Sequence, residues 1–242
     1  CGSSMGVPRA DGHYGNCDPK EKKNFRTRCS ALLQTKYKNI LFDTSPDLRF
    51  QLLSNKIKNI DLVFYSHMHA DQTHGINDLR VFYLKNKKTI PVYADNPTSK
   101  YLLKNFSYCF KKTFNEYPPI LNINRIRKKL YIKDYRKKIL INPIKVRHGK
   151  VDSVCYIIDK KLAYISDVSK INKKDYIFFK NLKFLILDCL WYRKHPSHFN
   201  LEQSLEMIEI LKPQKTILTD LHSDLDYNKL KKKLPKREIP AY

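Results

Sequence analysis

The sequence lacks a long apolar run. None of its hydrophobic segments approaches the roughly 18–20 consecutive apolar residues that a membrane-spanning helix requires. The first residues also lack the regions of a secretory signal peptide. We therefore expect a cytoplasmic protein with no membrane partner. Because the chain begins at Cys1 instead of methionine, its natural start is expected to lie upstream.

Paired cysteines are also lacking. No two of the six cysteines have C-x-x-C spacing. Cys155 and Cys189 lie in apolar, strand-like runs, which is typical of buried free thiols in a reducing compartment. Cys17, with His13 nearby, is the one thiol that could help to hold an accessory metal, and it does not make a complete site.

Acidic residues are scarce. Asp and Glu total 23 against 47 Lys and Arg, which gives a net charge of +24. Such a charge fits a nucleic-acid partner. However, the lysines are scattered over many segments and form no stripe with aromatic residues between them. We favour a solvated basic surface that attracts small anionic substrates, and the sequence leaves a homodimer open.

Internal repeats and low-complexity linkers are absent, so we predict one domain over residues 1–242. Residues 1–29 are rich in Gly, Pro, Asn and Asp and predict a long loop. Asn200 followed by Gln203 predicts the capped start of an amphipathic helix. The remaining pattern predicts mixed α/β layers, with strands over 39–45, 61–66, 90–95, 121–146, 182–190 and 215–220, a hairpin over 153–167, and helices over 75–85, 97–110 and 200–211.

Metal-ligand residue types follow the ends of the predicted strands. Layered α/β folds place their sites at such edges. Six of the eight histidines lie at these edges or in adjoining loops, a distribution that core histidines would not show. The candidates are His67, His69, Asp71, His74, His148, Asp167, His198, Asp220 and His222.

The stretch Ser66–Gly75, SHMHADQTHG, carries the most specific pattern. His67 and His69 supply two imidazoles close together, and Asp71 can reach a neighbouring ion. A divalent ion lowers the pKa of bound water from about 15.7 to near 7, provided that three or four ligands leave one position open. This pattern predicts one or two divalent ions, Zn²⁺ or Mn²⁺, that activate water.

This stretch resembles the H-x-H-x-D-H signature of the metallo-β-lactamase superfamily, with RHG, ISD and ILTD at its later motifs. The resemblance implies a four-layer αββα sandwich of α/β class. CGSSMGVPR, LFDTSPDLR, SHFNLEQSL and LTDLHSDLDY further resemble the branch that contains phosphoribosyl 1,2-cyclic phosphate phosphodiesterase. That branch implies a phosphodiesterase that opens a cyclic or small phosphodiester with metal-bound hydroxide.

The resemblance also implies individual roles. His67, His69 and His148 would hold a first metal, and Asp167 would bridge to a second. Asp71 would hold the second metal and serve catalysis there. His198 matches the histidine that protonates the departing alkoxide.

Two residues depart from the family pattern. Gln72 stands in place of a histidine ligand, and Asp220 stands where another histidine is common. The second position is therefore rich in oxygen, which favours Mn²⁺ or Mg²⁺ over Zn²⁺. His222, two residues beyond Asp220, could restore a nitrogen if that segment is extended. We expect a tight first metal and an exchangeable second.

Other readings stay open at this point. Asp43 either orients a ligand or stabilises its own turn, and Gln72 and His74 are expected to support the ligands. Within the superfamily, the basic charge also fits a tRNA 3′-processing endonuclease, although the arm that grips tRNA is not evident. Gln72 and Asp220 alternatively fit a degenerate site that binds a phosphate or nucleotide without turnover.

Overall fold

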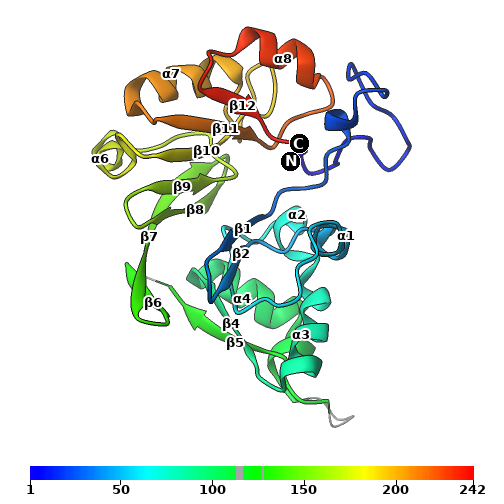
Figure 1. The fold of residues 1–242 in the computed structure, drawn as a ribbon, viewed down its shortest axis with the longest axis vertical. Helices are drawn as coiled ribbons and strands as arrows, with labels where there is room; N and C mark the ends of the chain where they lie inside the picture. Colours follow the sequence, from blue (N-terminus) through cyan, green and yellow to red (C-terminus); the bar gives the residue numbers. More distant parts are fainter. Residues whose placement is uncertain (113–116, 127) are drawn as a thin grey trace. The chain divides into compact units, whose positions relative to one another are not determined.

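The computed structural model describes residues 1–112, 117–126 and 128–242. The chain divides into two compact units, each built on one sheet (Figure 1). The first unit comprises Cys1–Cys29, Lys129–Ile132 and Ile139–Tyr242, and the second comprises Ser30–Lys128 and Lys133–Lys138. The single domain over 1–242 stays a prediction.

The sheet of the second unit has five strands within the described residues, in the order β1-β2-β3-β4-β5. β1 is antiparallel to β2, and the following strands run parallel. The strands are β1 (Ala31–Gln34), β2 (Asn39–Phe42), β3 (Leu62–Phe64), β4 (Ile90–Ala94) and β5 (Leu121–Arg125). The connecting helices are α1 (Leu48–Ser54), α2 (Ala70–Thr73), η2 (Ile76–Leu79), α3 (Arg80–Asn86), α4 (Asn96–Asn105) and α5 (Ser107–Phe110).

The core of the second unit explains why β3 and β4 read as nearly continuous apolar runs. Val63, Val92 and Ala94 are fully buried and pack with Leu48 and Leu79. Parallel strands connected by helices are covered on both faces, so both sets of side chains must be apolar.

The sheet of the first unit has the order β12-β11-β10-β9-β8-β7-β6. The β7, β8 and β9 strands are antiparallel, whereas β9, β10, β11 and β12 are parallel. The strands are β6 (Leu130–Asp134), β7 (Lys137–His148), β8 (Val151–Ile158), β9 (Leu162–Ile165), β10 (Phe184–Asp188), β11 (Lys215–Thr219) and β12 (Glu238–Pro240). The helices are η1 (Lys22–Asn24), η3 (Lys173–Asp175), α6 (Tyr176–Phe179), α7 (Leu201–Leu211) and α8 (Tyr227–Lys233).

The predicted start of α7 is confirmed. The Asn200 side chain accepts a hydrogen bond from the Gln203 backbone N–H at 3.0 Å. The Gln203 side chain accepts one from the Asn200 N–H at 3.1 Å in return, which completes a capping box.

Some sequence expectations differ from the structure. The helix predicted over 75–85 begins as the 3-10 helix η2 and continues as α3. The helix predicted over 97–110 is two helices, because Phe106 has a non-helical ψ of 36° between α4 and α5. The strands predicted over 121–146 do not all pair together, because β5 joins β4 in the second unit.

No helix among the described residues is long and apolar enough to cross a membrane.

Candidate metal centre

In the second unit, the loop after β3 presents His67 and His69. Asp43 is buried, has a positive φ of 61°, and directs Oδ1 at the Ser66 backbone N–H, 2.7 Å away. The Asp43 N–H donates to Phe64 O at 2.8 Å. Asp43 therefore fixes the backbone immediately before His67, as a residue that orients a ligand must.

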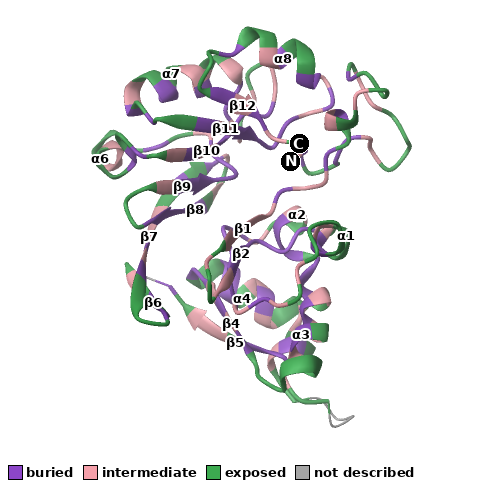
Figure 2. Cartoon of the chain, in the orientation of Figure 1, coloured by how far each residue is buried: buried purple, intermediate pink, exposed green. Residues whose placement is uncertain are grey.

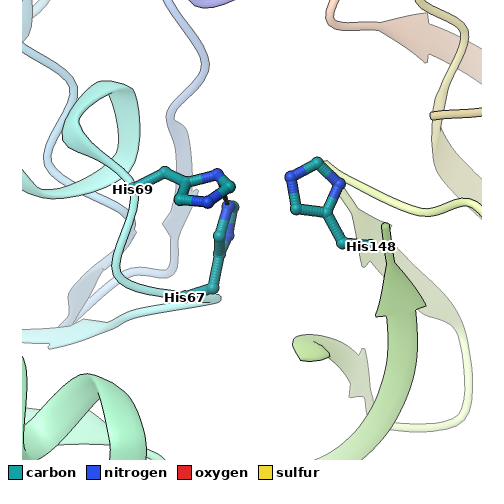
Figure 3. Close-up of side chains that lie close together, drawn as sticks. All are labelled: His67, His69 and His148. Carbon is teal, nitrogen blue, oxygen red and sulfur yellow. Dashed lines mark hydrogen bonds between the residues drawn. The ribbon is translucent and has the colours of Figure 1, made fainter. Parts of the chain in front are cut away.

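The two imidazoles lie against each other. His67 Nε2 is 2.9 Å from His69 Nδ1, and the rings meet edge to face with centroids 4.4 Å apart (Figure 3). On its other side, His67 Nδ1 is 3.0 Å from Ser66 Oγ, which fixes the ring orientation. His67 is buried and His69 is exposed. One compact pair of ligand nitrogens is therefore available on this loop.

The other candidates of the second unit surround α2. Asp71 lies in the first turn of α2, and the side chain of the buried Gln72 donates to Asp71 Oδ2 at 3.4 Å. His74 Nε2 lies 3.2 Å from the hydroxyl of Tyr101 on α4. Its ring meets Phe106 edge to face, so His74 is oriented by these two aromatic side chains.

In the first unit, four candidate residues lie where strands end. His148 ends β7, Asp167 follows β9, Asp188 ends β10, and Asp220 follows β11. Because β9, β10 and β11 are parallel, their carboxyl ends share one edge of the sheet. His148 Nε2 lies 3.9 Å from Asp167 Oδ1 at this edge.

The tautomer of His148 follows from its partner. His148 Nδ1 is 2.7 Å from the carbonyl oxygen of Ser197, which can only accept, so Nδ1 carries the proton. In the neutral form of His148 the lone pair is therefore on Nε2, the nitrogen that lies 3.9 Å from Asp167 Oδ1. This is the arrangement by which a backbone carbonyl prepares an imidazole for a metal.

His198 lies between carboxylates. Its Nδ1 is 2.9 Å from Asp188 Oδ2 and 3.2 Å from Asp220 Oδ2. Its ring also meets His148 edge to face, with centroids 4.6 Å apart. Two sets of three side chains could each hold an ion here, namely His148, Asp167 and His198, and Asp188, His198 and Asp220.

The charges of this group favour a protonated His198. Burial alone would lower the pKa of His198, but Asp188, Asp220 and Asp167 outweigh it and raise the pKa. Burial raises the pKa of Asp188, whereas the adjacent His198 opposes that rise. A protonated imidazole between carboxylates is suited to donate a proton.

Asp188 is a candidate that the sequence analysis missed. It is fully buried, and its Oδ2 accepts from the Val168 N–H at 2.8 Å as well as facing His198. One carboxylate oxygen thus connects His198 with the backbone that follows Asp167. The signal was present, because Asp188 ends an apolar strand in the same way as the other candidates.

Asp220 has a buried thiol beside it. Cys29 Sγ lies 3.7 Å from Asp220 Oδ1 and 3.3 Å from Thr219 Oγ1. Burial raises the pKa of the Cys29 thiol well above its usual range, so this group stays neutral and donates to the carboxylate. The contact orients Asp220.

His222 lies elsewhere in the first unit. Its ring packs on Trp191 with centroids 4.9 Å apart, and its Nδ1 accepts from the Asp224 N–H at 3.2 Å. It belongs to none of the three-residue clusters found among the described side chains. Its role as a ligand stays a prediction.

The opening loop is held by hydrogen bonds. The Asn24 side chain donates to Asp226 Oδ2 at 2.7 Å, and its Oδ1 accepts from the Tyr227 N–H at 2.8 Å. Buried Arg26 donates to Leu225 O at 2.7 Å. Cys17 is buried, and it belongs to no metal-type cluster in the described part of the chain.

Replacing Asn24 is expected to destabilise the protein. In Asn24→Ala, the buried Asp226 carboxylate and the Tyr227 N–H each lose a partner, so the free energy of unfolding should fall by about 1–3 kcal/mol. Urea denaturation followed by circular dichroism measures this. The matched control is Asn228→Ala, which removes only an exposed bond to Glu21 and should change the value by less than about 0.5 kcal/mol. Equal losses would contradict the anchoring role.

The strand-end arrangement of histidines and aspartates is that of a metallo-β-lactamase fold, and residues 38–220 match the model of the β-lactamase superfamily domain. The chain belongs to this superfamily of hydrolases, and its His/Asp clusters are suited to divalent metal ions.

Many solved structures are similar to this chain, and three of the known proteins illustrate the range. The crystal structure of a new diphosphatase from the PhnP family is 30% identical, with a TM-score of 0.87, and the match covers 100% of this chain and 91% of that one. Zn²⁺-bound PqqB from Methylobacterium extorquens shares the fold at 13% identity, with a TM-score of 0.78, over 100% of this chain and 95% of that one. An octanoyltransferase of Porphyromonas gingivalis (strain ATCC BAA-308 / W83) is 30% identical over 222 residues, which are 90% of this chain and 44% of that protein. The chain therefore spans less than half of this curated relative.

Proposed function

We propose that this protein is a metal-dependent phosphodiesterase that acts on a small or cyclic phosphodiester. The observation that carries the proposal is the position of His198. Its imidazole lies between Asp188 and Asp220 and against His148, which presents a metal-type lone pair. A proton donor beside a metal ligand is the pairing that cleavage of an ester with an alkoxide leaving group requires.

The donor set fits divalent ions. As the family resemblance implies, His67, His69 and His148 would hold a first ion, Asp167 would serve both ions, and Asp71 and Asp220 would hold a second. When bound, the ions supply an activated water and positive charge for the phosphate oxygens. Oxygen ligands dominate the second position, which favours Mn²⁺ there.

The remaining roles, protonation of the leaving group and attraction of the substrate, fall to side chains of the protein. Asp188 and Asp220 hold His198 protonated, and His198 gives its proton to the departing alkoxide. Such proton transfer contributes about 10²–10⁴-fold to the rate. The net charge of +24 favours an anionic substrate over a neutral ester. The similarity to a PhnP-family diphosphatase also supports the hydrolysis of a phosphoester.

The proposal predicts an activity that depends on metal and returns with it. Protein treated with chelator should lose hydrolysis of bis(p-nitrophenyl) phosphate and regain it with Mn²⁺ or Zn²⁺. Metal analysis without chelator should find one tight ion per chain, with the second lost on dialysis. The absence of any rate with every divalent ion would leave a phosphate-binding protein without turnover, and two equally tight zincs would contradict the weaker second position.

The charge also supports a second candidate, a tRNA 3′-processing endonuclease. Contacts to phosphates release counterions, so tRNA binding would weaken steeply with salt. A gel-shift titration of tRNA at rising salt separates the two candidates. We expect weak binding with no preference for the tRNA 3′ end, and tight binding with cleavage at that end would favour the endonuclease.

A further inference from the structure

The second unit carries an open apolar groove between α1 and α3. The groove encloses about 580 Å³, and its floor includes Leu52 and Phe82, which also belong to the buried core. Its walls are exposed. Leu53 is 61% exposed, Val81 57% and Leu84 53%. Figure 2 shows exposed positions along both helices.

Besides the side chains that face the core, the two helices together expose a second apolar surface. In α1, Leu48 and Leu52 face the core while Leu53 faces solvent. In α3, Phe82 faces the core while Val81 and Leu84 do not. A helix on the surface of a soluble domain normally has one apolar stripe, and a second contiguous stripe marks an interaction surface.

The rim of the groove is basic. Arg49, Lys58, Arg80 and Lys85 line it, against one acidic residue, Asp78. Lys85 Nζ donates to Lys58 O at 3.2 Å, which keeps this cation beside the groove. The Arg80 guanidinium lies 5.9 Å from the ring centre of Tyr117. The occupant must therefore be apolar along its middle and acidic along its sides.

This charge pattern decides among occupants. A second copy of the chain that docked through the same face would place its four cations against these four, because a two-fold interface pairs a surface with itself. The like charges would repel. A small amphiphile on the floor would leave Leu53 and Leu84 in water. A helix with apolar residues at i, i+3, i+4 and i+7 and acidic flanks covers both walls and meets the rim charges.

We propose that the groove between α1 and α3 docks an acidic amphipathic helix of a partner protein. The proposal is independent of the reaction assigned above, because it uses none of the candidate metal ligands. It provides a way to hold the hydrolase next to a second protein.

The test uses a fluorescent peptide of about 18 residues with a leucine stripe and glutamates elsewhere, titrated with the full chain by fluorescence anisotropy. We expect saturable binding that Leu53→Asp or Leu84→Asp weakens at least tenfold. Arg49→Glu combined with Lys85→Glu should weaken it similarly. Ile177→Asp, at a site 70% exposed on α6, is the matched control and should leave binding unchanged. Circular dichroism verifies that each variant folds.

Three outcomes would overturn the proposal. Equal binding of a peptide with lysine in place of glutamate would show that the rim charge does not select the occupant. Binding to anionic phosphatidylglycerol vesicles with none to the glutamate peptide would assign the groove to a membrane surface. A dimer in sedimentation that Leu53→Asp dissociates, again without peptide binding, would assign it to a second copy.

Discussion

His148→Ala is expected to lower the metal-dependent hydrolysis of bis(p-nitrophenyl) phosphate by about a thousandfold or more. Its Nε2 lone pair is directed by the Ser197 carbonyl, so alanine removes a prepared ligand nitrogen. A bound metal contributes several kcal/mol to such a reaction, and each 1.36 kcal/mol is tenfold in rate. The measurement is kcat/KM at saturating Mn²⁺ together with metal content, which should fall in parallel.

The matched control is His13→Ala. His13 lies in the opening loop, where its Nδ1 accepts from the Gly15 N–H at 3.0 Å, and it belongs to no metal-type cluster in the described residues. Its replacement should leave kcat/KM within about twofold of the parent. If His148→Ala kept both its metal and its rate, the assignment of His148 would be wrong.

Asp188→Asn is expected to lower the rate of hydrolysis most for substrates whose leaving group needs a proton to depart. With an alkyl phosphodiester the loss should approach 10²–10⁴-fold, the usual contribution of a general acid. With p-nitrophenyl esters it should be much smaller, because that leaving group departs without a proton. Asn keeps the shape of Asp188 but removes the charge that faces His198.

The pH profile of this variant separates positioning from a structural role. Asp188 is among the carboxylates that raise the pKa of His198, so its neutralisation should lower that pKa. In the parent the pKa of His198 is raised to about 10, so in the variant His198 would lose its proton at a lower pH. The rate with an alkyl leaving group should therefore begin to fall at a lower pH than in the parent. Asp11→Asn, which removes an exposed ion pair with Arg9, is the control and should not alter the profile. A uniform loss with every leaving group and an unchanged profile would contradict the role of Asp188.

Local sequence rules predicted the features that depend on neighbouring residues. The capping box of α7 requires only Asn200 and Gln203, and the hairpin over 153–167 requires two apolar runs around one turn; both are confirmed. The positions of Asp167 and Asp220 at strand ends were also readable, because each follows a largely buried strand. Asp188 could have been predicted in the same way, because it ends the apolar strand β10.

Features that depend on tertiary partners were not readable. β5 belongs to the sheet of the second unit because it pairs with β4. The helices α4 and α5 separate these two strands along the chain, so local sequence patterns do not show the pairing. The expectation for His222 assumed an extended chain after Asp220. Asp220 has a positive φ of 60°, so the chain is not regularly extended there, and the His222 ring packs on Trp191. The role of His222 as a ligand stays a prediction.

The most direct test of the account is anomalous diffraction from crystals of the protein soaked in Mn²⁺. We expect one strong peak coordinated by His67, His69 and His148. We expect a weaker peak at Asp71, Asp167 and Asp220. Crystals in which no peak touches His148 or Asp167 would contradict the assignment of this strand-end group as a metal centre.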